Sequence, residues 1–326
     1  MDRRGFIAAM AGGVAARPFA ALAQQPSKIA RVGFLGPTSL SPAASRLNGL
    51  RAGLAELGWV EGKNLVIEFR WAGGHYDRLA DLAVELVRSR VDVLVTQGTA
   101  AAQAAKRATP TIPIVMAIAV DAVATGIIES LARPGGNVTG LTFFGPELYA
   151  KRLELLKHAM PRLARLAVVF NPTNPSFRTW FAEVDAAAKA MKVELTRLEI
   201  RKVEEFEIAF EDMARRRVPA FAITDDAFFN ANLARIADLA ARKRLLSAGS
   251  REFAEAGGVI GYGHDSVALF HRAAFFVDRI LKGARPADLP VERPTKFELI
   301  VNLWSARAIG VTIPQALIGR ADEVLR

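Results

Sequence analysis

Residues 91–107 read VDVLVTQGTAAAQAAKR and combine a strand, a polar turn and the start of a helix. The apolar run at residues 93–95 predicts a strand that is buried on both faces of a parallel sheet. The loop TQGT at residues 96–99 then leads into an alanine-rich segment, which favours a helix whose first N–H groups are free. Open α/β sheets bind ligands at such loops, beyond the carboxyl ends of the strands. The stretch therefore predicts both an α/β fold and a ligand site.

The same order of strand, polar loop and helix recurs along the chain. In the first half we expect further strands at residues 30–35, 64–69, 112–119 and 138–143, with helices at 45–57, 76–88 and from about 121 to 132. In the second half we expect strands at 166–170, 193–200, 220–224, 245–248 and 259–262, with helices at 147–158, 177–191, 204–215 and 228–244. Strands that alternate with helices predict parallel sheets with helical crossovers. The fold class is therefore α/β, with two Rossmann-like lobes whose parallel sheets are flanked by helices.

The C-terminal part is longer than the second sheet requires. A helix at residues 267–281, a proline-rich connector at 284–294 and a strand at 297–302 follow the last strand of the second half. We expect the chain to return to the first lobe and then to cross back. The N-terminal lobe would comprise residues 27–142 plus about 266–296, and the C-terminal lobe residues 143–265 plus about 297–326.

The N-terminal residues 1–23, MDRRGFIAAMAGGVAARPFAALA, resemble a twin-arginine export signal. Arg3 and Arg4 precede a short apolar segment, and Ala21-Leu22-Ala23 fits a small-x-small cleavage site. The alternative is an ordinary amphipathic helix, but the segment has no polar face. We predict cleavage after about Ala23 and a periplasmic location.

Composition excludes several function classes. The 326 residues contain no cysteine, which excludes disulfides, thiol nucleophiles and thiolate metal sites. The net charge of +10 raises the question of nucleic-acid binding. However, the arginines are scattered, with short clusters only at residues 215–217 and 242–244, and no aromatic residues are interleaved with them. A solvated surface is the better explanation, and we expect no nucleic-acid partner.

Polar and aromatic residues at the ends of the predicted strands form the candidate ligand site. Hydroxyls, amides, carboxylates, an arginine and aromatic rings could together hold a small polar molecule with an apolar part. The predicted ligand-binding residues are Pro37, Thr38, Ser39, Gln97, Gly98, Thr99, Asp121, Phe143, Asn171, Thr173, Asn174, Asp225, Asp226, Arg251 and Tyr262. Structural alternatives remain open for some of them: Asn174, Asp225 and Asp226 could cap helices, and Arg251 with Glu252 could form a surface ion pair.

Catalytic signatures are absent from the sequence. It contains no HExxH, GxSxG, GxxxxGK[ST] or GxGxxG pattern, so no metal site, nucleophile elbow or nucleotide loop is supported. We therefore expect a protein that is not an enzyme, with no catalytic residues, no metal and no cofactor.

Several longer segments carry a family resemblance. VGFLGP at residues 32–37, LARPGGNVTGL at 131–141, AKRLELLKHAMP at 150–161 and ILKGARPADLPVERPTKFELIVNL at 280–303 resemble the substrate-binding proteins of ABC transporters. The similarity is to the family related to tryptophan/tyrosine binding proteins. It implies a type I periplasmic-binding-protein fold with hinge crossovers. It also implies a ligand cleft at residues 36–39, 96–99, 171–174 and 224–227 and at Tyr262.

The resemblance implies the solute-binding component of an ABC importer, a monomer that delivers a small ligand to a membrane permease. We expect a carboxylated ligand, aromatic or branched and amino-acid-like, because Phe143, Phe228 and Tyr262 fall near the predicted cleft. The alternatives are a ligand-sensing regulatory module of the same fold or an enzyme of small carboxylated metabolites. The sequence departs from the family pattern at residues 119–122, where relatives have Gly-Asp-Pro, and at residues 225–227, where they have Ala-Asp-Pro.

Overall fold

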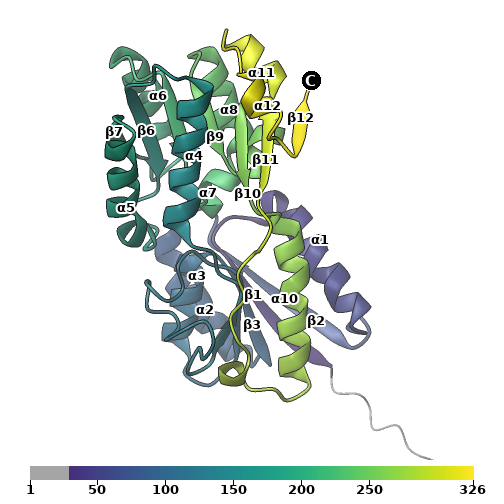
Figure 1. Ribbon diagram of the computed structural model, residues 1–326. Coiled ribbons are helices and arrows are strands. Elements are labelled where there is room, and N and C mark those ends of the chain that lie inside the picture. The colour runs from purple at the N-terminus through teal and green to yellow at the C-terminus, as the bar shows by residue number, and fades with distance from the viewer. Residues whose placement is uncertain (1–28) are drawn as a thin grey trace, which may run out of the picture.

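The computed structural model describes residues 29–326, which form two α/β lobes stacked end to end (Figure 1). The predicted export signal at residues 1–23 lies outside the described residues. Within residues 29–326 no helix has the length and apolar character needed to cross a membrane. Two α/β lobes with mostly parallel sheets flanked by helices confirm the predicted fold class.

The first lobe is built on a five-stranded parallel sheet with the strand order β2-β1-β3-β4-β5. Its strands are β1 (Ala30–Gly36), β2 (Leu65–Trp71), β3 (Val93–Gln97), β4 (Ile114–Ile118) and β5 (Val138–Gly140). Its helical elements are α1 (Leu40–Glu56), η1 (Tyr76–Arg78), α2 (Leu79–Arg88), α3 (Thr99–Ala108) and, from much later in the chain, α10 (Ser266–Leu281).

The central strand β3 is buried along its whole length, because helices cover both faces of the sheet. Val93 and Val95 belong to the apolar cluster that includes α1 and α10. Leu94 points the other way, into the cluster that includes α2 and α3. This alternation explains why the strand reads as a continuous apolar run.

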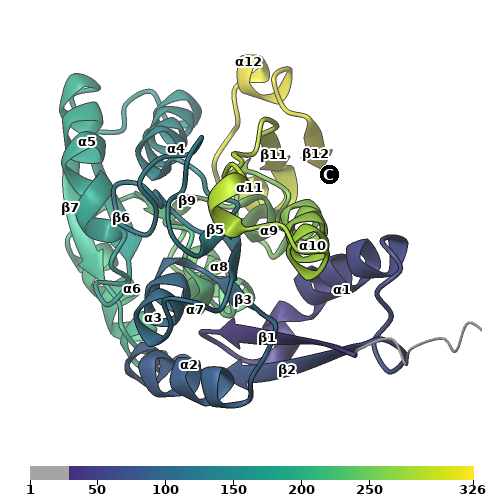
Figure 2. The ribbon, with the colours of Figure 1, turned by 90° about the horizontal axis from the view of Figure 1, so that it is seen from below.

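Helices α1 and α10 lie side by side (Figure 2), and two glycines let them approach closely. A Cβ on Gly49 would lie 2.7 Å from the carbonyl oxygen of Val267, and one on Gly53 would lie 2.5 Å from that of His271. Any larger residue at these positions would push the helices apart. The pair fixes α10 to the first lobe, although its sequence follows the strands of the second.

The second lobe holds a seven-stranded sheet with the order β12-β11-β10-β9-β8-β6-β7. Its strands are β6 (Arg165–Phe170), β7 (Glu194–Glu199), β8 (Ala220–Ile223), β9 (Leu246–Gly249), β10 (Ile260–Gly263), β11 (Glu298–Asn302) and β12 (Glu323–Leu325). All neighbours pair in parallel except β10 and β11, which are antiparallel. The helices are α4 (Gly145–Ala159), α5 (Phe177–Ala190), α6 (Glu205–Arg215), α7 (Ala227–Asn230), α8 (Leu233–Arg242), α9 (Arg251–Glu255), α11 (Leu303–Ala308) and α12 (Gln315–Ile318). The short η2 (Pro286–Asp288) lies against β5 of the first lobe.

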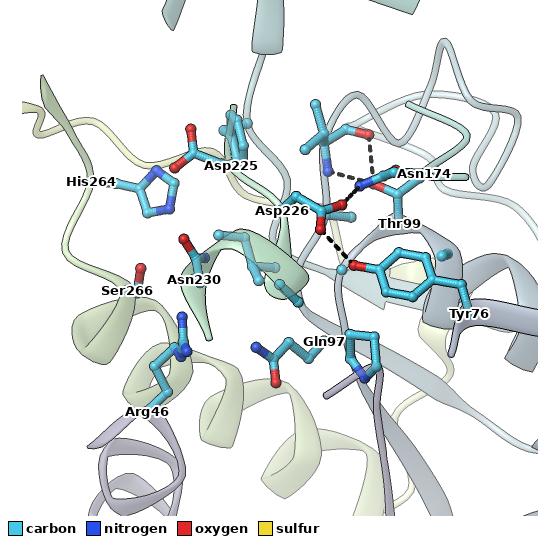
Figure 3. A pocket seen from close by; sticks show the side chains of 18 residues that line it. Arg46, Tyr76, Gln97, Thr99, Asn174, Asp225, Asp226, Asn230, His264 and Ser266 are labelled. Carbon is cyan, nitrogen blue, oxygen red and sulfur yellow. Dashed lines mark hydrogen bonds between the residues drawn. The ribbon is translucent and has the colours of Figure 1, made fainter. Parts of the chain in front are cut away.

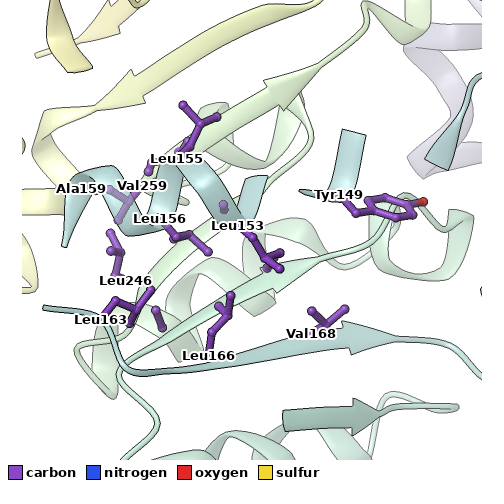
Figure 4. Packing of buried hydrophobic residues seen from close by; sticks show 14 of the residues in the cluster. Tyr149, Leu153, Leu155, Leu156, Ala159, Leu163, Leu166, Val168, Leu246 and Val259 are labelled. Carbon is purple, nitrogen blue, oxygen red and sulfur yellow. The ribbon is translucent and has the colours of Figure 1, made fainter. Parts of the chain in front are cut away.

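Helix α4 supplies much of the core of the second lobe. Its residues Leu153 and Leu156 pack over Leu166 and Val168 of β6 (Figure 4). The intervening residues of β6 face the opposite cluster, under α6 and α8. Each lobe therefore has its own hydrophobic core on each face of its sheet.

The chain crosses between the lobes three times, at residues 141–144, 264–265 and 289–297. Two of these segments are bonded to each other: the N–H of Thr142 donates to the carbonyl oxygen of Glu292 (3.0 Å), and the N–H of Glu292 donates to that of Gly140 (2.9 Å). These bonds tie two of the crossing segments together where they leave the first lobe.

Three predicted elements differ from the structure. The helix expected from about 121 to 132 is wrong, because turns fill this segment and the backbone takes positive φ values at Asp121 (47°) and Gly126 (71°). The helix expected at 228–244 is divided into α7 and α8, because the side chain of Asn232 bonds the Phe228 carbonyl oxygen where α7 ends. Helix α1 begins at Leu40 and not at residue 45, since Pro42 lies in its first turn, where no intrahelical N–H is needed.

Candidate functional site

A pocket lies between the two lobes, at the carboxyl ends of their strands (Figure 3). Its empty space, open mouth included, is about 550 Å³. Apolar residues line part of the pocket. The remaining lining residues, mostly polar or aromatic, come from both lobes and from the crossings; they are Pro37, Arg46, Tyr76, Gln97, Thr99, Phe143, Asn174, Asp225, Asp226, Asn230, His264 and Ser266.

The first lobe contributes the amino end of α3. Gly98 adopts φ 86°, a conformation that favours glycine, and so turns the chain from β3 into the helix. The hydroxyl of Thr99 accepts the N–H of Val120 at 2.9 Å, which ties the loop after β4 to the helix start. The N–H groups of the first helical turn are not used by the helix itself and carry the positive end of its dipole. This end of the pocket favours a negative group.

Arg46 adds a positive charge from α1. Its side chain is largely buried, and Nη2 donates to the carbonyl oxygen of Pro42 at 2.7 Å. Its Nε is buried without a hydrogen-bond partner. Burial lowers the pKa of Arg46, and the charge of Glu252 opposes that shift. Arg46 was not predicted, although its place among the apolar residues Ala43, Leu47 and Leu50 is a signal that sequence reasoning could have used.

Asp226 joins the two lobes. Its carboxylate accepts the hydroxyl of Tyr76 in the first lobe (2.8 Å), the amide of Asn174 (2.7 Å) and the N–H of Phe228 (2.9 Å). The last bond makes Asp226 the N-cap of α7, so the capping alternative is correct for this residue. Burial raises the pKa of Asp226, while its hydrogen bonds oppose that shift. The pKa of Tyr76 also lies above its usual value, first because of burial and then because of Asp226.

Asp225 is paired inside the second lobe with Arg152 of α4. The Nη1 of Arg152 lies 2.7 Å from Oδ2 of Asp225, and Nη2 donates to Oδ1 at 3.1 Å. The contact to Oδ2 is an ion pair whose angles fall outside hydrogen-bond geometry. Arg152 is fully buried and also donates to the carbonyl oxygens of Tyr262 and Ile223, both at 2.9 Å. Asp225 therefore anchors a buried arginine that sequence reasoning missed.

His264 lies at the crossing between β10 and α10. Its ring is 4.9 Å from that of Phe143, which belongs to another crossing. Burial lowers the pKa of His264, so the imidazole is neutral near pH 7. Its Nδ1 is buried without a partner.

Four buried polar atoms of residues that line the pocket thus lack a hydrogen-bond partner: Arg46 Nε, Gln97 Oε1, His264 Nδ1 and Asp225 Oδ2, the last of which is ion-paired with Arg152. A buried polar atom without a hydrogen bond is costly, and such atoms are rare in folded proteins. Because these atoms gather at one pocket, we infer that a bound molecule supplies their missing hydrogen bonds. Among the described residues no group of three or more histidine, aspartate or glutamate side chains could hold a metal ion.

The structure brings about half of the predicted residues to this pocket. The residues that line it are Pro37, Gln97, Gly98, Thr99, Phe143, Asn174, Asp225 and Asp226. The residues that do not line it are Thr38, Ser39, Asp121, Asn171, Thr173, Arg251 and Tyr262. The lining residues Arg46, Tyr76, Asn230, His264 and Ser266 were not among those predicted.

The predicted residues outside the pocket have other surroundings. Arg251 forms ion pairs with Glu255 and Glu298, so it is a structural residue as its alternative expects, but with partners other than the predicted Glu252. Tyr262 stacks on Phe297 with 6.0 Å between ring centroids. Asp121 lies beside the hinge, in a separate hollow with Arg293.

The remaining predicted residues outside the pocket lie in the loop around Asn171 and just before α1. Asn171 accepts the N–H and hydroxyl of Thr173 in a turn. Thr38 is buried and Ser39 is the exposed N-cap residue of α1. Phe228, which supported an aromatic ligand, is instead stacked on Phe206 in the core.

Comparisons with known proteins agree on one family. Residues 36–325 match the model of the family described as ABC transporter substrate binding protein. A tyrosine-binding protein of Clostridioides difficile is 25% identical over 262 residues, which cover 80% of this chain and 75% of the relative.

Solved structures have the same fold. A conserved domain protein from Vibrio cholerae has a TM-score of 0.85 at 27% identity, over 91% of this chain and 100% of that one. The ABC domain in complex with L-Trp from Streptococcus pneumoniae has a TM-score of 0.83 at 24% identity, over 91% and 99%.

Proposed function

The chain belongs to the family of ABC transporter substrate-binding proteins, and from this premise we propose that it captures a small carboxylated ligand, amino-acid-like or an aromatic acid, between its lobes. The ligand would then be delivered to a membrane permease. One observation carries the proposal: the pocket between the lobes holds unpaired polar atoms around a positive charge and an apolar wall.

The ligand class follows from the chemistry of the pocket. Arg46 and the start of α3 favour a carboxylate, because both present N–H donors and positive potential. Phe143, Ile118 and Ala100 offer apolar surface to the rest of the ligand. The names of the relatives point the same way, since tyrosine and L-Trp are small carboxylated molecules with an aromatic part.

Binding would favour the closed arrangement of the lobes. A ligand that contacts Arg46 and Gln97 on one side and the residues of the second lobe on the other gains those contacts together only when the lobes are closed. The bond between Tyr76 and Asp226 contributes to the same arrangement. A permease that recognises the closed form would thus receive the loaded protein preferentially.

Location and assembly form part of the same proposal. The twin-arginine signal at residues 1–23 would direct export to the periplasm, and the mature protein would act as a monomer. Its lobe boundaries would be those given by the sequence, at residues 27–142 with about 266–296 and at 143–265 with about 297–326.

A thermal-shift screen of amino acids and aromatic acids tests the proposal. A ligand at one hundred times its Kd should stabilise the protein by about 2.7 kcal/mol and raise its melting temperature. The same samples, analysed for chemical change, should show the ligand unaltered. If none of the carboxylates raises the melting temperature, the proposed ligand class is wrong, and if one is converted, the protein is an enzyme.

A further inference from the structure

The two carboxylates that line the pocket are already occupied by partners within the protein. Asp225 contacts the guanidinium of Arg152 through both of its oxygens, at 2.7 and 3.1 Å. Arg152 is fully buried, so the pair is shielded from water and its charges compensate each other. Drawing Asp225 toward a ligand cation would leave Arg152 without its counter-charge.

Asp226 is engaged on both oxygens as well. Oδ1 accepts the hydroxyl of Tyr76 and the N–H of Phe228, and Oδ2 accepts the amide of Asn174. The side chain is 3% exposed. Its burial raises its pKa, which means that the surroundings already disfavour its negative charge. Asp226 therefore serves the contact between the lobes and not a ligand cation.

Glu252 is a third carboxylate in this region, but it does not line the pocket. Its charge acts on Arg46, and although burial opposes the shift, hydrogen bonds from its own N–H and from Ser266 hold its pKa low. Its negative charge is thus directed to groups of the protein.

Asp225 Oδ2 has no hydrogen bond but is neutralised by the ion pair with Arg152, and the other groups without hydrogen bonds are cationic or neutral. Arg46 brings a full positive charge and an unpaired N–H at Nε. Gln97 and His264 are neutral. Gln97 can donate a hydrogen bond to a carboxylate oxygen or a hydroxyl if its amide is turned the other way, and His264 can do so in the tautomer that carries a proton on Nδ1. An ammonium group bound here would be buried near Arg46, and it would have to share Asp225 with Arg152 or Asp226 with Tyr76 and Asn174. Burying a charge without a counter-charge is strongly unfavourable.

We propose that the ligand is a small monocarboxylic acid with an apolar body and no α-ammonium group, an inference that rests on the proposed function. The carboxylate lies at Arg46 and the start of α3, and the apolar body lies against Phe143 and Ile118. The site rejects amino acids because its two acidic residues are satisfied before the ligand arrives.

Titration calorimetry on the purified protein, dialysed free of any bound ligand, tests this inference. The ligands are matched sets that differ only in their charged groups. The pairs are hydrocinnamate with phenylalanine, phloretate with tyrosine, and isocaproate with leucine. The corresponding amines, phenethylamine, tyramine and isopentylamine, lack the carboxylate. In the pair that binds best, the acid should bind at least tenfold more tightly than the amino acid, and the amine should bind most weakly.

The outcomes separate this inference from the proposed function. An amino acid that binds as tightly as its deaminated acid, or more tightly, overturns the inference and leaves the proposed function standing. An amine that binds more tightly than the acid overturns the inference and the role of Arg46. If no member of any pair binds, both the inference and the proposed ligand class are wrong.

Discussion

The two walls of the pocket differ in how far their polar groups are already satisfied. On the second lobe, Asp225, Asp226 and Asn174 belong to a network whose members bond one another, Arg152 or Tyr76. On the first lobe, Arg46 Nε and Gln97 Oε1 have no partner, whereas Asp225 Oδ2 on the second lobe lacks a hydrogen bond but is ion-paired with Arg152. The difference indicates a division of labour, in which the second wall is fixed by internal bonds and the first wall provides the groups that select the ligand.

The strongest test of this contrast removes the anchor of the second wall. We expect Arg152→Met to destabilise the protein by about 3–5 kcal/mol, because it leaves Asp225 buried without its partner. Urea denaturation measures the loss. The double variant Arg152→Met with Asp225→Leu should recover most of it, since no buried charge then remains. A loss below about 1 kcal/mol in the single variant would show that the pair does not hold the wall.

Asp121 offers a contrast to the paired acids of the second wall, because it is a buried acid with an unpaired oxygen outside the pocket. Burial, opposed by the Gly145 N–H, raises its pKa to about 6. The folded state thus binds the proton more tightly than the unfolded state. The stability that Asp121 contributes is present at low pH and is lost as the pH rises from about 4 to about 6.

The variant Asp121→Asn removes this titration and keeps a residue type that tolerates positive φ. At pH 7 it should be more stable than the parent by roughly 1–3 kcal/mol, and below about pH 4 the difference should vanish. Urea denaturation of both proteins at each pH checks this. A difference that stays constant between the two pH values would contradict a raised pKa at Asp121.

The ligand-selecting role of the first wall is tested at Arg46. We expect Arg46→Gln to weaken binding of the preferred acid by about 10–100-fold, since hydrogen bonds to charged groups contribute about 1.5–3 kcal/mol. Calorimetry measures the change. Arg51→Gln is the matched control, because Arg51 lies on the same helix but pairs with Glu61 at the surface. Equal affinities for the two variants would exclude Arg46 from the site.

The smallest effect is expected at the bond between the walls. Tyr76→Phe keeps the ring and removes the hydroxyl that donates to Asp226. The closed arrangement should lose about 1 kcal/mol, and the affinity for ligand should fall several-fold. Small-angle scattering of the ligand-free variant should show a larger radius of gyration than the parent. An unchanged radius together with an unchanged affinity would mean that this contact does not favour closure.

Sequence patterns predicted the fold better than the site. A continuous apolar run such as residues 93–95 predicts a strand that is buried on both faces. The structure places helices of the same lobe on both sides of this strand. The loops at residues 97–99 and 225–226 follow strand ends, so parallel topology alone brings them to the pocket. The segment after β4 failed, because positive φ at Asp121 and Gly126 is a tertiary effect that composition does not reveal.

Three of the missed residues share a physical reason. Arg46 and Arg152 project from helices, and Tyr76 lies in a short η1 turn, so none of them is at a strand end. Their roles depend on partners far away in the sequence, 73 positions for Arg152 with Asp225 and 150 for Tyr76 with Asp226. The first pairing arises only when the second lobe is folded, and the second only when the two lobes face each other.

The central claim is that the unpaired groups between the lobes receive a carboxylate. A crystal structure of the protein with its tightest-binding acid tests this most directly. The account predicts a carboxylate oxygen within hydrogen-bond distance of Arg46 Nε, with the apolar body against Phe143 and the Arg152–Asp225 pair intact. A ligand seated outside the pocket, or one whose positive group displaces Arg152 from Asp225, would contradict it.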